Sequence, residues 1–273
     1  MMGYEQLGQY SSSVSYGILK WSEDREIVHN REQIKYILKS CKEFNNAFKP
    51  SPVADSSASS RFLGILRNGF EELWNGSLSG EDLVGGKKGF WVDLNKTGIL
   101  AAYPESIHRY FNSVTVTGNA LEINADIGAT SDLISHKFSN YVRNNNKFSR
   151  RNDLVFDIGK TVEYFDKKFD YVIGSNALTR ISDKERALTN IKKFLEDDGT
   201  VVLVEGEAYP ANMPFVLNNA FGLLNDWWKN DGFMEGDRWA KLFIENGFEI
   251  KDLISIKSDD TIVIGNLFVL KRK

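Results

Sequence analysis

The sequence has few of the residues that build disulfides and metal sites. It contains one cysteine, Cys41, and three histidines, His29, His108 and His136, which stand far apart in a chain of 273 residues. A single cysteine excludes an internal disulfide and a site of several cysteines, and the scattered histidines leave zinc without its usual ligands. We therefore expect no bound metal and a reducing, cytoplasmic setting.

An excess of basic charge is also absent. The 34 Lys and Arg residues are matched by 37 Asp and Glu residues, so the chain lacks the basic footprint of proteins that bind nucleic acid. No apolar run approaches the roughly 20 residues that a membrane-spanning helix needs. The first residues, "MMGYEQLGQYSSSVSYG", lack the charged start and apolar stretch of a signal peptide. We expect neither nucleic acid nor a membrane as partner, and we interpret residues 1–29 as a linker.

Two amphipathic helices are predicted in the segment after this linker. Apolar residues recur at helical spacing within residues 30–48 and again within residues 59–76. We assign residues 30–115 to a helical lid. The apolar stripes consist of Ile34, Ile37, Leu38, Cys41 and Phe44 in the first helix, and of Phe62, Leu63, Leu66, Phe70 and Leu73 in the second, which Gly76 ends.

From about Ala120 onward, short apolar runs alternate with helical patterns. The runs include "ALEINA", "DLVFDIG", "FDYVIGSNA", "TVVLVEGE" and "IVIGNLFVLKRK", and the helical patterns are "ERALTNIKKFLEDDG" and "DRWAKLFIENGFEI". Strands that alternate with helices indicate a doubly wound, mostly parallel α/β sheet, which we assign to residues 116–273. The polar segment "SNYVRNNNKFSRRND" is interpreted as a solvated connection.

Ligands of such sheets bind beyond the carboxyl ends of the strands. Three segments lie there, "NADIGA", "DIGK" and "GSNALTR", and we expect them to line one pocket. The first belongs to "NALEINADIGATS", a strand, turn and helix with one glycine, Gly128. From these residues alone, the turn is either a nucleotide-binding loop without most of its glycines or an ordinary turn.

An ordered set of segments resembles the C-methyltransferase domains of polyketide synthases, over roughly Glu72 to Lys273. The most specific combination is an Ser-Asn-hydrophobic-Leu turn, a strand ending in Glu, paired tryptophans after "FGLL", and a last helix running from Trp to Gly-Phe. The resemblance implies a Rossmann-like class I methyltransferase fold with a seven-stranded sheet. The segments are "LWNGSLSGEDL", "YPESIHRYFN", "LEINADIGATSDLI", "DLVFDIGK", "FDYVIGSNALTRI", "LTNIKKFLEDDGTVVLVEGE", "FGLLNDWW" and "RWAKLFIENGF".

The resemblance also implies where S-adenosylmethionine would bind. Of the glycines expected in the turn after the first strand, Gly128 remains, and Asn140 falls where an acidic residue normally holds the ribose. Asp157 matches the position beside adenine, but an Asp at a strand end before Gly is also an ordinary turn former, which is the interpretation we favour. Glu122 either orients the loop or ends a strand. The full set of matching cofactor positions is Glu122, Asn124, Asp126, Gly128, Asn140, Asp157, Ser175 and Asn176.

The catalytic pair implied by the resemblance is incomplete. Thr179 occupies the position of the family's catalytic histidine, and Glu205 matches its glutamate partner. A threonine hydroxyl has no useful basicity near neutral pH, and neither His108 nor His136 is an evident substitute. Glu205 is either a remnant of the pair or a hydrogen-bonded strand end.

Charge in the turn argues against the methyl donor as well. If the carboxylate of Asp126 stood ~4 Å from the cofactor's own carboxylate, repulsion would reach about 4 kcal/mol at an effective dielectric near 20. Two other features leave alternatives open. Trp227 and Trp228 either wall a substrate tunnel or pack the lid, and "RNNNKFSRR" either docks an acidic carrier domain or forms a solvated loop.

Two main hypotheses follow. The first is a non-catalytic pseudo-methyltransferase domain of a modular polyketide synthase, with a structural or docking role, no cofactor, and neighbouring synthase domains and an acyl carrier protein as candidate partners. The second is an active S-adenosylmethionine-dependent C-methyltransferase that methylates the α-carbon of a β-ketoacyl chain on an acyl carrier protein, with Glu205 or a displaced group as base. A third, a module that binds another synthase domain, overlaps with the first.

Overall fold

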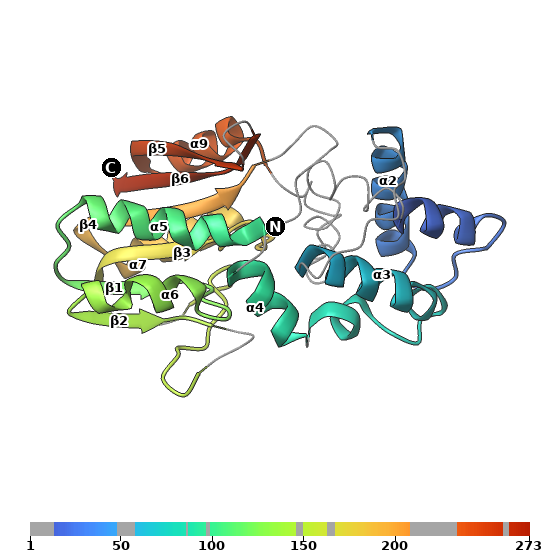
Figure 1. Cartoon of the computed structure of the whole chain (residues 1–273). Helices are drawn as coiled ribbons and strands as arrows, with labels where there is room; N and C mark the ends of the chain where they lie inside the picture. Colours follow the sequence, from blue (N-terminus) through green and yellow to red (C-terminus); the bar gives the residue numbers. More distant parts are fainter. Residues whose placement is uncertain are drawn as a thin grey trace. The chain divides into compact units, whose positions relative to one another are not determined.

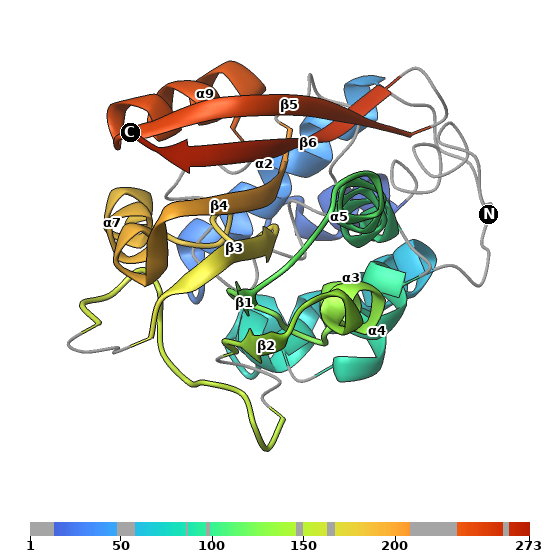
Figure 2. The ribbon, with the colours of Figure 1, turned by 90° about the vertical axis from the view of Figure 1, so that its left-hand side faces the viewer.

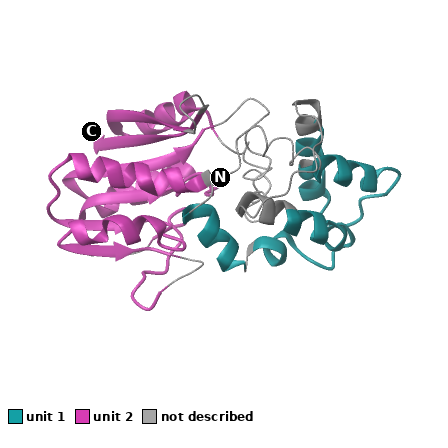
Figure 3. Cartoon of the chain, in the orientation of Figure 1, with its two compact units in different colours: residues 1–99, 209–232 teal, residues 100–208, 233–273 magenta. Residues whose placement is uncertain are grey.

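The computed structural model describes residues 14–47, 58–85, 87–96, 99–145, 150–162, 167–207, 234–258 and 262–273. The contacts within the chain divide it into two units, residues 1–99 with 209–232 and residues 100–208 with 233–273 (Figure 3). In its described part the first unit is helical, and the second contains the sheet.

Both predicted amphipathic helices are present in the first unit. Side chains of the predicted stripes are buried, among them Ile34 and Cys41 from one helix and Leu66 and Leu73 from the other. Gly76, with a φ of 78°, follows the second helix, as expected for a glycine stop. The elements are α2 (Arg31–Ala47), α3 (Ala58–Asn75), the π-helical turn η1 (Glu81–Gly85) and α4 (Lys88–Lys96).

Part of the predicted linker is a packed helix. Residues 14–22 are helical, and Val14 and Ile18, one turn apart, are buried. The indole of Trp21 lies edge-on to that of Trp74, with ring centroids 5.4 Å apart. The polar composition of the segment obscured this short apolar stripe, and residues 1–13 lie outside the described part.

The second unit is built on a sheet of mixed direction (Figure 1). The strands run in the order β2-β1-β3-β4-β6-β5. Neighbours from β2 to β4 are parallel, and β6 is antiparallel to both β4 and β5. The strands are β1 (Asn119–Glu122), β2 (Asn140–Arg143), β3 (Phe169–Ser175), β4 (Leu195–Gly206), β5 (Phe248–Ser258) and β6 (Ile262–Arg272).

Helices cover both faces of this sheet, which confirms the doubly wound α/β class. Figure 2 shows α5 (Ala102–Ser113) and α6 (Ala129–Ile134) on one face, and α7 (Lys184–Phe194) and α9 (Gly236–Glu245) on the other. The 3-10 turns η2 (Ile99–Ala101) and η3 (Ser135–Lys137) flank α5 and α6. The core beneath α7 and α9 includes the buried rings of Phe194, Trp239, Phe243, Phe248 and Phe268.

The number of strands differs from the expected seven. Among the described residues there are six, because "DLVFDIG" contributes a single parallel bridge, from Leu154 to Asn144, and Val155 is exposed. Conversely, β2 lies in the segment interpreted as a solvated connection. That strand is short and polar, so its sequence carries no apolar alternation to reveal it.

Helix α5 belongs to the sheet unit by its contacts. The hydroxyl of Tyr103 donates to the backbone carbonyl of Ile264 in β6, and the ring of Phe111 packs edge-on against Tyr171 in β3. The boundary set by contacts therefore falls between residues 99 and 100, one helix earlier than the sequence boundary at residue 115.

The interpretation of Trp227 and Trp228 falls outside the described residues, and so do residues 146–149 within "RNNNKFSRR". None of the helices that the structure describes is long and apolar enough to cross a bilayer.

Candidate functional site

The predicted site residues gather at one edge of the sheet. Glu122 ends β1, Ser175 ends β3, and Glu205 is the penultimate residue of β4. Because these strands are parallel, their carboxyl ends meet at the same edge, which is the edge where ligands of such sheets bind. The loop after β1 and the loop after β3 face each other there.

The turn after β1 keeps a left-handed backbone despite its missing glycines. Asn124 has a φ of 48°, Asp126 of 46° and Gly128 of 82°. Asn and Asp adopt this region more readily than other side chains do. The backbone N–H of Ala125 donates to the carbonyl of Asn144 at 2.9 Å, which joins the turn to the end of β2. The tight turn is therefore formed by residue types that tolerate its left-handed backbone.

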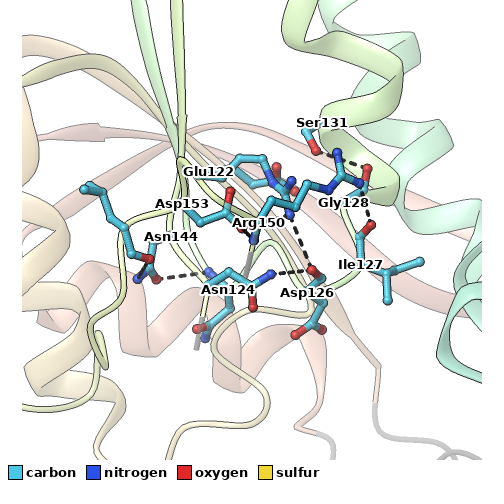
Figure 4. Close-up of polar contacts among 12 residues, drawn as sticks. Glu122, Asn124, Asp126, Ile127, Gly128, Ser131, Asn144, Arg150 and Asp153 are labelled. Atoms are coloured by element: carbon cyan, nitrogen blue, oxygen red, sulfur yellow. Dashed lines mark hydrogen bonds and ion pairs between the residues drawn. The ribbon is translucent and has the colours of Figure 1, made fainter. Parts of the chain in front are cut away.

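Gly128 is the residue before α6, and its missing side chain leaves room for Arg150. A Cβ built on Gly128 would lie 2.5 Å from a guanidinium nitrogen of Arg150. That guanidinium donates to the carbonyl of Ile127 at 2.9 Å (Figure 4). It also lies 3.4 Å from the carboxylate of Asp132. An arginine therefore covers the backbone at the end of this turn.

The carboxylate of Asp126 is paired with Arg180 from the loop after β3. The two groups approach to 2.5 Å, and their side chains are 25% and 13% exposed. Arg180 also donates to the carbonyls of Asn176 at 3.3 Å and Asn124 at 3.5 Å. This guanidinium links the two loops and neutralises the charge that the sequence analysis treated as unpaired.

Asparagines at the end of β2 support the same turn. The side chain of Asn144 accepts from the backbone N–H of Asn124 at 3.3 Å and donates to the carbonyl of Phe156 at 2.8 Å. The amide of Asn145 donates to the carbonyl of Asp126 (Figure 4 shows the carboxylate and amide groups of this turn). Both asparagines are fully buried, so they fix the turn instead of facing solvent.

Asn140 does not take part in the site. It is the first residue of β2 and is exposed, so it lies at the edge where the parallel strands begin. The residue that follows β2 at its carboxyl end is Asn144. The alignment was displaced because β2 was not recognised as a strand.

Arg143, the last residue of β2, forms a buried ion pair behind the turn. Its guanidinium lies 3.3 Å from the carboxylate of Asp153, and the two side chains are 9% and 4% exposed. It also donates to the carbonyl of Asp126 at 3.4 Å. Arg143 therefore adds a second guanidinium contact to the backbone of the turn.

Glu122 is buried and connects β1 to β2. The hydroxyl of Tyr141 donates to its carboxylate at 3.1 Å. Burial raises the pKa of Glu122 to about 8, although Arg143 and the hydrogen bonds from Tyr141 and Ser131 act in the opposite direction. The carboxyl group thus holds strand ends and the start of α6 together.

The carboxylate of Glu205 is occupied by the loop that contains Thr179. One oxygen accepts from the backbone N–H of Leu178 at 2.8 Å. The other accepts from the backbone N–H of Thr179 at 2.9 Å and from its hydroxyl at 2.6 Å. Glu205 is fully buried, and burial raises its pKa above the usual range despite these hydrogen bonds. The structure brings Thr179 and Glu205 together as predicted, and the threonine hydroxyl donates to the carboxylate.

Ser175 and Asn176 carry β3 into this loop. Asn176 has a φ of 54°, and its side-chain oxygen accepts from the backbone N–H of Gly206 at 3.2 Å. Its side-chain nitrogen is buried without a hydrogen-bond partner among the described residues. Ser175 pairs with Val204 in the sheet. The two residues anchor the loop to β4.

Asp157 forms a local turn. Its carboxylate accepts from the backbone N–H of Gly159 at 2.9 Å and lies 3.5 Å from the ammonium group of Lys160. These contacts match the turn-former interpretation of the sequence.

The histidines offer no base in this region. His136 lies in η3, between α6 and the start of β2, and therefore toward the opposite edge of the sheet. The ring of His108 contacts the side chain of Asn112 one turn further along α5, at 3.0 Å. Among the described residues, no cluster of His, Cys, Asp or Glu side chains is arranged to hold a metal ion.

Sequence reasoning missed several side chains that shape the site: Arg143, Asn144, Asn145, Arg150 and Arg180. Arg180 ends the quoted segment "GSNALTR", and the others stand in the polar run "RNNNKFSRR", which begins at the last residue of β2. A signal existed, because charged and amide side chains directly after parallel strands are candidates for such an edge.

Comparison with known proteins supports the sequence resemblance. No model of a protein family matches the chain. A stretch of 93 residues, 31% of the chain, is 34% identical to the hybrid PKS-NRPS synthetase buaA of Petromyces alliaceus. Another of 89 residues is 29% identical to the non-reducing polyketide synthase subA of Metarhizium robertsii. The matched parts span 2% and 4% of those proteins.

Solved structures match over nearly the whole chain. The CurJ carbon methyltransferase superposes with a TM-score of 0.73 at 14% identity, covering 98% of this chain and 91% of that one. The CMeT domain of the citrinin polyketide synthase gives 0.75 at 13% identity, with 97% and 88% covered. The trans-methyltransferase CalH, solved in complex with SAH, gives 0.75 at 13% identity, with 98% and 90% covered. The chain therefore has the fold of the carbon methyltransferase domains of polyketide synthases, and the resemblance found in its sequence is confirmed.

Proposed function

We propose that this chain is a non-catalytic pseudo-methyltransferase domain of a modular polyketide synthase, with a structural or docking role in the assembly line. The observation that carries the proposal is the contact between Thr179 and Glu205. The threonine hydroxyl donates to the buried carboxylate at 2.6 Å, and the same carboxylate accepts from two backbone N–H groups. A group that abstracts a proton must reach the substrate and be free to accept that proton, whereas Thr179 is not basic and the fully buried carboxylate of Glu205 already accepts three hydrogen bonds.

The turn after β1 supports the same proposal. Arg180 crosses from the loop after β3 to the carboxylate of Asp126 and to the carbonyl of Asn124. The segment corresponds to the cofactor turn of the family, where close approach of a ligand to the backbone is needed. The guanidinium and carboxylate stand between the loops and satisfy each other, so we expect no bound cofactor.

A second candidate function is an active S-adenosylmethionine-dependent C-methyltransferase. Two observations favour it. The left-handed turn is preserved, and burial raises the pKa of Glu205, which makes its carboxylate more basic. In that case Thr179 would have to release Glu205, and S-adenosylmethionine would displace Arg180 from Asp126.

The proposed setting follows from the synthase relatives. We place the domain in the cytoplasm, beside neighbouring domains of a polyketide synthase and within reach of an acyl carrier protein. A pull-down of the purified chain with the flanking domains of its parent synthase would test these partners.

Calorimetric titration separates the two candidate functions. The purified chain is titrated with S-adenosylmethionine and with S-adenosylhomocysteine, and CalH, whose structure contains SAH, serves as positive control. We expect a dissociation constant above about 1 mM for both ligands, which corresponds to a binding free energy weaker than about 4 kcal/mol. A second assay offers a carrier-bound β-ketoacyl thioester with the methyl donor and monitors the product by mass spectrometry.

The outcomes bear on different parts of the proposal. Binding in the micromolar range would show that the cofactor still fits, and the docking role would then have to coexist with an occupied pocket. Methyl transfer to the thioester would overturn the proposal as a whole.

A further inference from the structure

Basic residues from three distant segments meet at the edge of the sheet opposite the candidate site. Lys168 precedes β3, Lys192 and Lys193 lie at the end of α7, and Arg272 and Lys273 stand at the end of β6. Because β6 is antiparallel to β4 and β5, its end lies beside their beginnings. The edge is therefore the one where the parallel strands start.

These five side chains line a hollow of about 480 Å³, together with Thr189 and Gly247. None of the described residues that line it is acidic. Asp197, near the start of β4, lies 3.7 Å from Lys168 and 3.4 Å from Arg272, and its side chain is 89% exposed. The five cationic side chains that line the hollow outnumber the nearby carboxylate of Asp197, so these side chains carry a net positive charge.

Two of the five cations, Lys192 and Lys193, contact polar groups near helix ends. The ammonium group of Lys192 donates to the carbonyl of Asn246 at 2.8 Å, after the last turn of α9. Lys193 donates to the side chain of Asn190 at 3.5 Å, near the end of α7, where positive charge is favourable. Lys168 directly precedes β3 and Arg272 ends β6, and their side chains are 44% and 42% exposed. Like charges gathered in one place repel one another, so capping alone does not explain the set.

We propose that this hollow, lined by Lys168, Lys192, Lys193, Arg272 and Lys273, is the docking surface for an acidic segment of another polypeptide. The cations are exposed and come from several elements, so they match an extended row of carboxylates. A site built for one small anion would hold it with buried donors. Exposed charges of this kind steer a partner and set its orientation.

The inference rests on the docking role proposed above for its biological setting, but it is independent of the cofactor. The hollow and the turn after β1 lie at opposite edges of the sheet. Binding of an acidic partner and binding of S-adenosylmethionine can therefore be measured separately on the same chain.

The test uses a fluorescein-labelled peptide of glutamates, titrated with the full chain and followed by anisotropy. We expect saturable binding at low salt that weakens several-fold when the salt is raised, because exposed ion pairs are screened. The double variant Lys168→Glu/Lys193→Glu should bind about tenfold more weakly or worse. The matched control is Lys241→Glu/Lys251→Glu, which makes the same charge change at lysines that are 73% and 48% exposed and are paired with Glu245 and Glu249.

Three results would overturn the proposal: no saturable binding at low salt, equal loss in the two double variants, or displacement of the peptide by inorganic phosphate at an equal concentration of charge. The last result would assign the hollow to a small anion. Circular dichroism of each variant verifies that it is folded. If the chain binds S-adenosylhomocysteine while the peptide results hold, the pseudo-methyltransferase proposal is weakened and the docking surface stands.

Discussion

At the scale of single residues, the site is defined by carboxylates that the protein has already satisfied. Glu205 accepts from Leu178 and Thr179, and Asp126 is paired with Arg180. A buried carboxylate with several donors stabilises the loop that supplies them. In the proposed pseudo-methyltransferase, these residues therefore act as structural ties.

Removing the hydroxyl of Thr179 tests this structural interpretation. In Thr179→Val, Glu205 loses one of its three donors, and we expect the free energy of unfolding to fall by about 1–3 kcal/mol. Urea denaturation followed by circular dichroism measures the change. Thr189→Val is the control, because the exposed Thr189 hydroxyl bonds to a carbonyl of its own helix, and its effect should stay within about 0.5 kcal/mol. Equal effects in the two variants would contradict the role given to Thr179.

The buried Glu122 predicts a pH dependence of stability. Its pKa in the folded protein, about 8, lies above the ordinary value of 4.5. A raised pKa means that the folded state holds the proton more tightly than the unfolded state does. The contribution to stability is therefore complete below about pH 4.5 and is lost as the pH rises toward 8.

In Glu122→Gln this part of the pH dependence should disappear. Between pH 5 and pH 8 we expect the wild-type free energy of unfolding to fall by about 3 kcal/mol relative to the variant, from about 1.4 kcal/mol per pKa unit. Denaturation curves at several pH values measure it. Glu249→Gln, at the exposed Glu249, should run parallel to the wild type, and a parallel Glu122→Gln curve would refute the prediction.

At the scale of elements, the turn between β1 and α6 keeps its shape through left-handed asparagine and aspartate. Asn124 has a φ of 48°, and its side chain donates to the carbonyl of Ala177 at 2.9 Å. The turn is thus held by backbone conformation and by contacts to the loop after β3. Asn124 and Asp126 stand in the turn where the family resemblance implies glycines, and both have a left-handed backbone.

Two substitutions at Asn124 separate these contributions. Asn124→Gly and Asn124→Ala both remove the hydrogen bond to Ala177, but alanine is also disfavoured at positive φ. We expect the alanine variant to be less stable than the glycine variant by about 1 kcal/mol. Thermal or urea unfolding of the pair decides the question, and an alanine variant as stable as the glycine variant would show that the turn relaxes out of its left-handed conformation.

At the scale of the whole molecule, the residues that maintain the fold are different from those that form the candidate site. The superposition on carbon methyltransferases extends over almost the entire chain, whereas the proposed loss of function concerns only the position of Thr179 and the turn after β1. A fold can persist without its chemistry because its stability comes from the core and its activity from a few residues at one edge. The core under α7 and α9 is intact.

The single cysteine gives a probe of the helical unit. Cys41 in α2 is fully buried, and burial raises the pKa of its thiol, so little thiolate is available to react. We expect iodoacetamide to label Cys41 in the native chain at least about tenfold more slowly than in urea-unfolded chain. Mass spectrometry of timed samples measures it. Comparable rates would show that the unit opens readily under native conditions.

Ligand-induced stabilisation tests the whole-chain proposal in a second way. Because a ligand of the folded state raises stability by mass action, a concentration of 100 Kd would add about 2.7 kcal/mol. We expect S-adenosylhomocysteine at 1 mM to leave the unfolding temperature unchanged and to raise that of CalH. A clear upward shift for this chain would contradict the absence of a cofactor.

Much of the fold was predictable from local patterns. Apolar residues at helical spacing indicate α2 and α3, and short apolar runs indicate β1, β3, β4 and β6. The polar β2 carries no such pattern. The segment "DRWAKLFIENGFEI" was interpreted as helical to Ile250, but α9 ends at Glu245 and β5 begins at Phe248, after Gly247 with its φ of 80°.

The candidate site was predicted in part. Thr179 and Glu205 were paired through the family resemblance, and the structure brings them together. Asn140 was misplaced, because its assignment depended on the position of β2. Arg180 was missed as a partner of Asp126, because no local pattern connects the loops after two different strands.

The sequence by itself determined the class of fold and the edge of the sheet at which the candidate site lies. These follow from residue identity and short-range periodicity. Only the tertiary structure decided that Asp126 is neutralised by Arg180, that Thr179 donates to Glu205, and that three basic segments meet in one hollow. The physical reason is that such contacts join residues distant along the chain, and strand order and direction alone bring them within reach of one another.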